Sequence, residues 1–591
     1  MKKPEGPAET FDPRRPHHFK PGLAGRDRSE TTQDKPLALS RSRLRVAAFA
    51  FVAAFSIISL RLADATLLQA PDPEIAKLGQ TTEVTPPHFS RADIVDRNGV
   101  VLATTIQIAS LFANPKLIDE PAKVAHELVR ILPHSNEQEL YARLSSGKSF
   151  VWLQRRLTSQ QEAAVNALGV PGLNFEHEEQ RIYPQGALSS HVVGYTDLDG
   201  KGLAGIERSF NNALGSSHDP LKLTIDIRLQ AIVREELLKQ IQAFNGIGGT
   251  GIVMNVKTGE VLSLVSLPDF DPNDMNTIVP DTIFDRATLG VYEMGSVFKI
   301  FTVSMALNNG TAWLSKMYDV NPIHIGRFII HDDEPQSHPI NVARIFQISS
   351  NIGSAHMAME VGAEKQKAFL ASLGLLRPPS IEIPEVGVPQ IPRVWRDINT
   401  MTIAFGQGIA VSPIQLAVAA NAVIDGGILR PATLIKPPPG FDPPGQRILP
   451  EPIALTMRKL LRLVVTDGTG RKANVPGYWV GGKTGSAQKT LAHGGYAKKS
   501  LISSFIGFFP MNDPQYLVYV LVDDPHGNKE SYGFATGGWV GAPLAGRIIA
   551  RMAPLYGLKP IPETPELDRQ IVIDPNAPGG APPGSRKIAS K

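Results

Sequence analysis

The second half of the chain carries short apolar runs typical of β-strands, separated by segments with helical periodicity. Strand-like runs occupy residues 221–226, 249–256, 260–267, 501–509 and 516–523. Between the first two runs, leucine, isoleucine and valine recur at helical spacing and predict an amphipathic helix over 227–244. A sheet that combines early and late strands, with helices between them, predicts a mixed α/β (α+β) domain over 220–560.

The pattern changes near residue 220. Ahead of it, residues 92–105 form a strand-like entry with a turn at Asn98-Gly99, and helical periodicity follows over 121–132 and 159–168. We therefore expect a separate α+β unit over 69–219. The two ends differ from both units, because residues 1–43 are polar and predict a disordered tail, while the Pro/Gly-rich residues 561–591 predict a flexible end.

An uncharged apolar run covers residues 46–60, and further apolar residues continue it past Arg61 and Asp64. A bilayer core needs roughly 20 helical residues, so we predict a single membrane anchor over 44–68. Three arginines precede the run, which predicts a cytoplasmic N-terminus and a catalytic part outside the cytoplasm. A buried core helix and a signal peptide cleaved at Ala63-Asp64-Ala65 are the alternatives. The long, charged and Pro-rich leader disfavours both.

Composition and charge exclude several classes of function. The chain of 591 residues is 42% hydrophobic and 20% charged, which is typical of a folded multidomain protein. Residues 1–45 hold 11 Lys/Arg against 6 Asp/Glu, so the excess over neutrality lies in the leader and the remainder nets to −1. The charge of the remaining residues therefore gives no support for nucleic-acid binding. The absence of cysteine excludes disulfides, thiolate catalysis and Cys-ligated zinc.

Three short motifs stand in one order along the chain: Ser296-Val-Phe-Lys299, Ser349-Ser-Asn351 and Lys483-Thr484-Gly485-Ser486. This order is typical of serine acyl-transfer enzymes of the penicillin-binding kind. Each motif also has copies elsewhere, at Ser145/Lys148, Ser486/Lys489, Ser209/Asn211 and Lys257-Thr258-Gly259. The copies lack the right context, since the last of them joins two strand-like runs and is best interpreted as a hairpin turn.

The first motif supplies a nucleophile and a base. Serine needs a base within hydrogen-bond reach, and helical spacing of three puts Ser296 and Lys299 on one face, one turn apart. Ser296 also lies near a helix start, where free backbone N–H groups can stabilise an oxyanion. Burial beside aromatic residues, or proximity to a second cation such as Lys483, would lower the pKa of Lys299 and let it accept a proton.

The second motif follows an apolar helical stretch over 342–348 and begins another helix, so it should connect two helices. Ser349 could relay protons and Asn351 could hold a substrate amide. A plain Ser/Asn helix cap is the alternative, and it is the better interpretation of this motif taken alone. The order of the three motifs favours the catalytic one.

Two further patterns invite other functions. Residues 477–484 match the phosphate-binding G-x-x-x-x-G-K-[ST] loop, but no buried strand precedes them and no helix follows, so an ATPase is disfavoured. His324, His331 and His338 recur every seven residues beside Asp332 and its acidic neighbours. That spacing places side chains together only on a helix, which the prolines of this segment oppose. We interpret it as a polar loop and not as a metal site.

The three motifs and several others resemble the class B penicillin-binding proteins, most closely the septal cell-division transpeptidases of Gram-negative bacteria. The likeness covers about residues 45–555. Its further segments are Arg91–Gly99, His191–Gly194, Gly202–Glu207, Phe405–Ile409 with Pro413 and Gln415, and Gly468-Thr469. Valine at 297 and serine at 486 depart from the threonine of many members, and neither change puts activity in doubt.

The resemblance implies a penicillin-binding fold with an antiparallel sheet, and a role for each motif residue. Ser296 would attack the penultimate D-Ala carbonyl of a stem peptide, with Lys299 as general base. Ser349 and Lys483 would shuttle protons, and Asn351 would bind the substrate amide. The donor carboxylate would face Thr484, Gly485 and Ser486, and the oxyanion would lie at the backbone N–H groups of Ser296 and Ser486. No metal or organic cofactor is implied.

The resemblance also implies partners and a location. The unit over 69–219 would be a non-catalytic pedestal that binds division proteins, including an FtsW-type glycosyltransferase. The protein would lie in the bacterial inner membrane at the division site, with a periplasmic catalytic domain that β-lactams acylate. Elongation-specific transpeptidases remain the main alternative, because the motifs do not separate the two roles. A β-lactamase, a carboxypeptidase or a β-lactam sensor is disfavoured by the single anchor and the large pedestal.

Overall fold

The computed structural model describes residues 49–60, 91–133, 135–326, 328–490, 495–562 and 564–575. The chain divides into two units, residues 1–88 and 89–591. In the first unit, residues 49–60 are helical with exposed side chains. The rest of the predicted anchor over 44–68, and the predicted tail over 1–43, lie outside the described residues. Within the described ranges, no helix is long and apolar enough to cross a membrane.

A five-stranded antiparallel sheet forms the centre of the larger unit. Its order is β14 (Gly481–Thr490), β15 (Tyr496–Phe509), β16 (Tyr516–Asp523), β6 (Gly248–Asn255) and β7 (Val261–Leu267). The early strands therefore pair with the late ones, as the sequence predicts. Strand β14, which carries the third motif, lies at one edge of the sheet. The rival copy Lys257-Thr258-Gly259 forms the predicted hairpin turn between β6 and β7.

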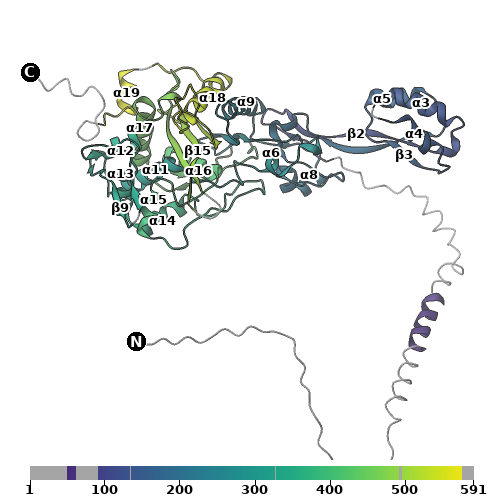
Figure 1. Cartoon of the computed structure of the whole chain (residues 1–591), viewed down its shortest axis with the longest axis horizontal. Coiled ribbons are helices and arrows are strands. Elements are labelled where there is room, and N and C mark those ends of the chain that lie inside the picture. Colours follow the sequence, from purple (N-terminus) through teal and green to yellow (C-terminus); the bar gives the residue numbers. More distant parts are fainter. Residues whose placement is uncertain are drawn as a thin grey trace, which may run out of the picture. The chain divides into compact units, whose positions relative to one another are not determined.

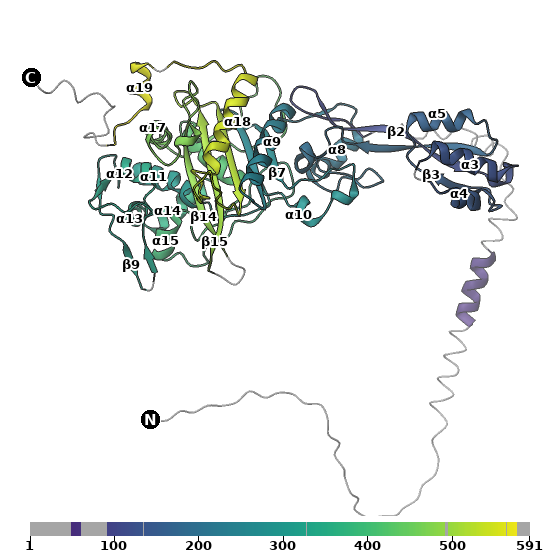
Figure 2. The ribbon, with the colours of Figure 1, turned by 45° about the horizontal axis from the view of Figure 1, so that its top comes forward.

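Both faces of the sheet are buried, because successive apolar side chains of its central strands point to opposite faces and fill two separate cores. On β16, Val518 and Val520 belong to the core under one face, while Leu517 and Tyr519 belong to the core under the other. Figure 2 shows α9 and α18 on one side of the strands and α11, α12 and α13 on the other. This three-layer packing holds the edge strand β14 in a fixed position.

The helices of the larger unit that concern the site are α9 (Ile227–Ala243), α11 (Lys299–Asn308), α12 (Val342–Ile348), α13 (Asn351–Val361), α14 (Ala363–Ser372), α15 (Asp397–Ile403), α16 (Pro413–Ile424), α17 (Glu451–Asp467) and α18 (Gly541–Leu555). A single turn of 3₁₀-helix, η5 (Gly295–Phe298), precedes α11. The amphipathic helix predicted over 227–244 is thus confirmed as α9. Asp226 caps it by accepting a hydrogen bond from the backbone N–H of Arg228.

The N-terminal part of the larger unit has its own sheet. Its strands are β1 (Ile94–Val95), β2 (Val101–Ala113), β3 (Val151–Gln154), β4 (Leu173–Ile182) and β5 (Leu221–Lys222), and its helices include α3 (Pro121–Ile131), α4 (Glu137–Leu144), α5 (Ser159–Ala167) and α7 (Gly205–Ser209). Strands β2 and β4 pair along their length, and α3, α4, α5 and β3 gather at one end of them (Figure 1). The helices predicted over 121–132 and 159–168 are confirmed as α3 and α5.

Two predictions differ from the structure. The strand predicted over 221–226 ends at Lys222, because Asp226 already caps α9. Within the predicted flexible end over 561–591, residues Pro565–Ile571 form α19, and both Ile571 and Ile573 are buried. Burial of these two isoleucines stabilises the segment against the rest of the protein. The high proline content of the segment had predicted a flexible end instead. Residues 576–591 lie outside the described residues.

A buried ion network ties the N-terminal part together. The Glu207 carboxylate on α7 is fully buried and accepts hydrogen bonds from the Nε of Arg91 (2.6 Å) and the Nε of Arg181 (2.7 Å). Arg91 also donates to the backbone carbonyl of Glu207 at 2.7 Å. One carboxylate therefore joins the entry segment to strand β4 and α7, although Arg91 lies 90 residues before Arg181 and 116 before Glu207.

Replacing Glu207 by alanine is expected to destabilise this part of the protein by about 3–5 kcal/mol, because two buried guanidinium groups lose their counter-charge. Hydrogen exchange measured along β2 and β4 would report the loss as faster local opening. Glu176→Ala is the matched control, since Glu176 lies exposed on β4 and should change stability by less than about 0.5 kcal/mol. Equal protection in the two variants would show that the network is not structural.

Candidate active site

Ser296 lies on η5, directly against the edge strand β14. The preceding residue, Gly295, has φ +54°, and a Cβ placed on it would lie 2.3 Å from the carbonyl oxygen of Ser486. Only glycine permits both this left-handed conformation and this close approach. The backbone N–H of Gly295 is held by the carbonyl of Gly406 at 3.1 Å. These contacts bring the nucleophile of the first motif beside the third motif.

Lys299 is fully buried at the start of α11, and four oxygen atoms surround its amine. Its Nζ lies 2.9 Å from the Oγ of Ser296, 2.5 Å from the carbonyl of Ser349, 3.1 Å from the Oγ of Ser349 and 2.7 Å from the Oδ1 of Asn351. A neutral amine has two N–H donors and one lone pair. The Ser349 carbonyl and the Asn351 amide oxygen are pure acceptors, so together they use the two donors and leave the lone pair for a hydroxyl, of which that of Ser296 is the nearer.

The protonation of Lys299 suits this arrangement. The pKa of Lys299 falls to about 7, chiefly because burial penalises the charged ammonium, while the carboxylates of Asp332 and Asp333 act in the opposite direction. The sequence left open whether burial or a nearby cation would lower the pKa of Lys299, and burial is the cause that operates. The amine can therefore be neutral near physiological pH and accept a proton from Ser296.

Ser349 ends α12 in a left-handed conformation, with φ +65° and ψ +44°. This conformation is uncommon for a residue other than glycine, and it marks a strained position. Its hydroxyl lies between two amines, because the Nζ of Lys483 is 2.9 Å away and the Nζ of Lys299 is 3.1 Å away. Lys483 is also fully buried, and burial followed by the proximity of Lys299 holds its pKa well below the usual range.

The third motif runs along the edge strand β14. The hydroxyl of Thr484 contacts that of Thr469 at 2.7 Å, and the hydroxyl of Ser486 accepts a hydrogen bond from the backbone N–H of Gly537 at 2.9 Å. A Cβ on Gly485 would lie 2.3 Å from the Oγ of Ser504, so glycine is required here as well. The structure thus brings all three predicted motifs together. The individual roles assigned to their residues, including the oxyanion contacts, stay predictions.

Asp332 is a member of the site that the sequence did not single out. Its side chain is 6% exposed, and its carboxylate accepts hydrogen bonds from the hydroxyl of Ser350 and from the backbone N–H of Asn351. The sequence placed Asp332 in a polar loop and gave no signal for this contact. That segment holds a short hairpin, β9 (Ile323–Ile325) with β10 (Phe328–Ile330). In the described part of the chain, no three His, Cys, Asp or Glu side chains cluster as metal ligands would.

Two of the competing copies of the motifs begin away from the site. Ser145 follows the last residue of α4, and Ser209 ends α7. The segment that matches a phosphate-binding loop leads into β14, with Lys483 as the third residue of this edge strand. A phosphate loop requires the lysine to precede a helix, so the structure contradicts that interpretation.

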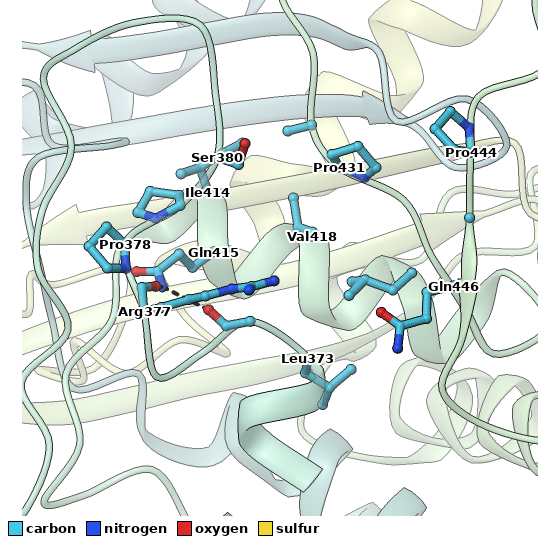
Figure 3. A pocket seen from close by; sticks show the side chains of 15 residues that line it. Leu373, Arg377, Pro378, Ser380, Ile414, Gln415, Val418, Pro431, Pro444 and Gln446 are labelled. Carbon is cyan, nitrogen blue, oxygen red and sulfur yellow. Dashed lines mark hydrogen bonds between the residues drawn. The ribbon is translucent and has the colours of Figure 1, made fainter. Parts of the chain in front are cut away.

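Two pockets lie near these elements. One, of 430 Å³, is formed by the ends of α14 and α16 and by proline-containing loops, with Leu373, Val418 and Arg377 around it (Figure 3). None of its lining residues belongs to the three motifs. The other, of 530 Å³, is lined by Glu293, three residues before Ser296, and by Gln488, two residues after Ser486. The second pocket therefore continues the site along β14.

Comparisons with known proteins agree with this arrangement. The model of the penicillin binding protein transpeptidase domain matches residues 249–549, and that of the penicillin-binding protein dimerisation domain matches residues 88–219. A probable peptidoglycan D,D-transpeptidase FtsI of Caulobacter vibrioides is 39% identical, covering 84% of this chain and 85% of its own. FtsI of Escherichia coli is 28% identical, with coverages of 82% and 87%.

A solved structure shows the same fold. Penicillin binding protein 3 of Mycobacterium tuberculosis, crystallised as a complex with aztreonam, superposes with a TM-score of 0.64 at 24% identity. The superposition covers 82% of this chain and 98% of that structure. The predicted mixed α/β fold of the penicillin-binding kind is thereby confirmed.

Proposed function

This chain belongs to the class B penicillin-binding proteins, and we propose that it is a peptidoglycan D,D-transpeptidase that cross-links stem peptides during septal wall synthesis. The observation that carries the proposal is the buried cluster of Ser296, Lys299, Ser349 and Lys483, joined by hydrogen bonds of 2.9–3.1 Å between side chains. A nucleophile with a neutral base, and a hydroxyl between two amines, are the parts that acyl transfer through a serine ester needs.

The reaction follows from the roles of these groups. Neutral Lys299 takes the proton of the Ser296 hydroxyl as its oxygen attacks the penultimate D-Ala carbonyl of the donor stem. The backbone N–H groups of Ser296 and Ser486 stabilise the oxyanion. The leaving nitrogen receives a proton through Ser349 and Lys483, and the terminal D-Ala departs. An amine of a neighbouring stem then attacks the ester and regenerates Ser296.

Substrate binding is assigned to the remaining motif residues. Asn351 would hold the amide of the donor stem, and Thr484, Gly485 and Ser486 would face its carboxylate. The 530 Å³ pocket beyond Gln488 offers room for the part of the donor that precedes the reacting carbonyl. A β-lactam would enter the same site and leave a stable ester on Ser296. Its ring presents the same carbonyl and carboxylate as the donor.

We assign the domains and location on the same basis. The tail spans 1–43, a single inner-membrane anchor 44–68, the pedestal 69–219, the transpeptidase domain 220–560 and the end segment 561–591. The arginines before the apolar run support a cytoplasmic N-terminus and a periplasmic catalytic domain. Relatives named FtsI support a place at the division site. An FtsW-type glycosyltransferase and other division proteins are the partners of the pedestal that the motif resemblance implies.

Incubation of the full-length protein in detergent with pentapeptide-bearing glycan strands is expected to release D-Ala and form cross-linked dimers, which mass spectrometry would detect. Release of D-Ala with tetrapeptide alone would mean transfer to water and would support a carboxypeptidase instead.

A fluorescently tagged copy of the protein is expected to localise at midcell in dividing cells. Even signal along the side wall would favour the elongation role.

A further inference from the structure

The carboxylate of Asp332 reaches the second motif from outside it. Asp332 follows β10 by two residues and lies eighteen residues before Ser350. One carboxylate oxygen accepts from the Ser350 hydroxyl at 2.6 Å, and the other accepts from the backbone N–H groups of Asn351 at 2.5 Å and Ile352 at 3.1 Å. These are the first N–H groups of α13, which have no acceptor within the helix. Asp332 therefore fixes where α13 begins.

The same segment also fixes the side chain of Asn351. Its Nδ2 donates to the backbone carbonyl of His331 at 3.1 Å, and its Oδ1 accepts from the Nζ of Lys299 at 2.7 Å. Because the carbonyl of His331 accepts only from the amide nitrogen, the amide oxygen must face Lys299. Asp332 thus holds the backbone of Asn351, and His331 holds its side chain. The amide oxygen of Asn351 in turn accepts one N–H of the Lys299 amine.

Asp332 bears on the amine by charge as well. Three titratable groups face Lys299. Asp332 and Asp333, from the segment after β10, act on its pKa, and Lys483, from β14, is the neighbour whose own pKa Lys299 lowers. The two carboxylates favour the protonated amine, whereas burial opposes it. Loss of the Asp332 charge would therefore lower the pKa of Lys299 further.

We propose that Asp332 is a positioning residue of acyl transfer, which holds the start of α13 so that Asn351 directs the lone pair of Lys299 at Ser296. The proposal rests on the proposed function, because it assigns Lys299 as the base. A residue that merely capped α13 would affect stability, yet it would leave the rate of acylation and its pH dependence unchanged in the folded protein.

The test is the second-order rate of acylation of the full-length protein by a fluorescent penicillin, measured from pH 5.5 to 9. In Asp332→Asn, the plateau rate is expected to fall about 10- to 100-fold, since a small misplacement of a catalytic group costs up to about 10². The acid limb, which is the fall in rate at low pH as Lys299 becomes protonated, should also move to lower pH. The pKa of Lys299 falls because the amine has lost a nearby negative charge.

Asp333→Asn is the matched control. Asp333 is exposed and carries the second nearby charge, so this variant should shift the limb in the same direction and keep the wild-type plateau. Asp332→Glu keeps the charge but displaces the carboxylate, and it should lower the plateau with little movement of the limb. It also serves if Asp332→Asn does not fold.

An Asp332→Asn protein that is folded and keeps the wild-type plateau would overturn the proposal, whether or not its limb moves, as would an Asp332→Glu protein with a wild-type plateau. A wild-type protein that no penicillin acylates at any pH would instead overturn the proposed function. The two failures are therefore distinguishable in one set of measurements.

Discussion

Replacement of Ser296 by alanine is expected to abolish covalent labelling by a fluorescent penicillin, with a loss of at least about 10⁴-fold in acylation rate. The hydroxyl of Ser296 is the nearer of the two hydroxyls around the Nζ of Lys299, at 2.9 Å, and two pure acceptors use the N–H donors of that amine. Intact-protein mass spectrometry would check the result, since acylated wild type gains the mass of the drug and the variant should not.

Ser145→Ala is the matched control, because Ser145 belongs to the rival Ser-x-x-Lys copy and lies exposed after α4. This variant should label at the wild-type rate. If Ser296→Ala labels as fast as the wild type, the nucleophile is misassigned. Ser349 would then be the next candidate, since its hydroxyl contacts both buried amines.

Much of the fold could be predicted because its signals are local. Strands such as β6, β7 and β16 are short, mainly apolar runs buried on both faces, and the helical periodicity of α9 is visible in its own sequence. The pairing of β16 with β6, across more than 250 residues, follows once a sheet must combine early and late strands. The candidate catalytic residues were predicted for a different reason, which is the order of three motifs.

Asp332 shows what local patterns do not contain. It reaches Ser350 across a segment that holds two prolines and the short helix α12, so neither helical nor strand periodicity relates the two residues. The left-handed conformation of Ser349 is equally invisible in the sequence, because Ser349 adopts it where α12 must end before α13 begins. Both features depend on tertiary packing, which a pattern of apolar positions does not specify.

Replacement of Lys299 by methionine, which fills a similar volume without an amine, is expected to slow acylation by about 10³- to 10⁴-fold, in the upper range for loss of a general base. Lys299 is fully buried, and a neutral side chain removes both the base and the donors that hold Asn351 and the Ser349 carbonyl. Stopped-flow acylation at pH 8 would measure the loss. Lys148→Met, in the rival exposed copy, should react at the wild-type rate.

The pH profile tests the same residue independently. Only the neutral amine can accept the proton of Ser296, and the pKa of Lys299 is lowered to about 7 by burial. The wild-type rate should therefore be nearly constant above about pH 8 and fall about tenfold for each pH unit well below 7. The residual rate of Lys299→Met should lack this limb. A limb that persists unchanged in the variant would assign the titrating base to Lys483, whose pKa burial and the proximity of Lys299 also lower.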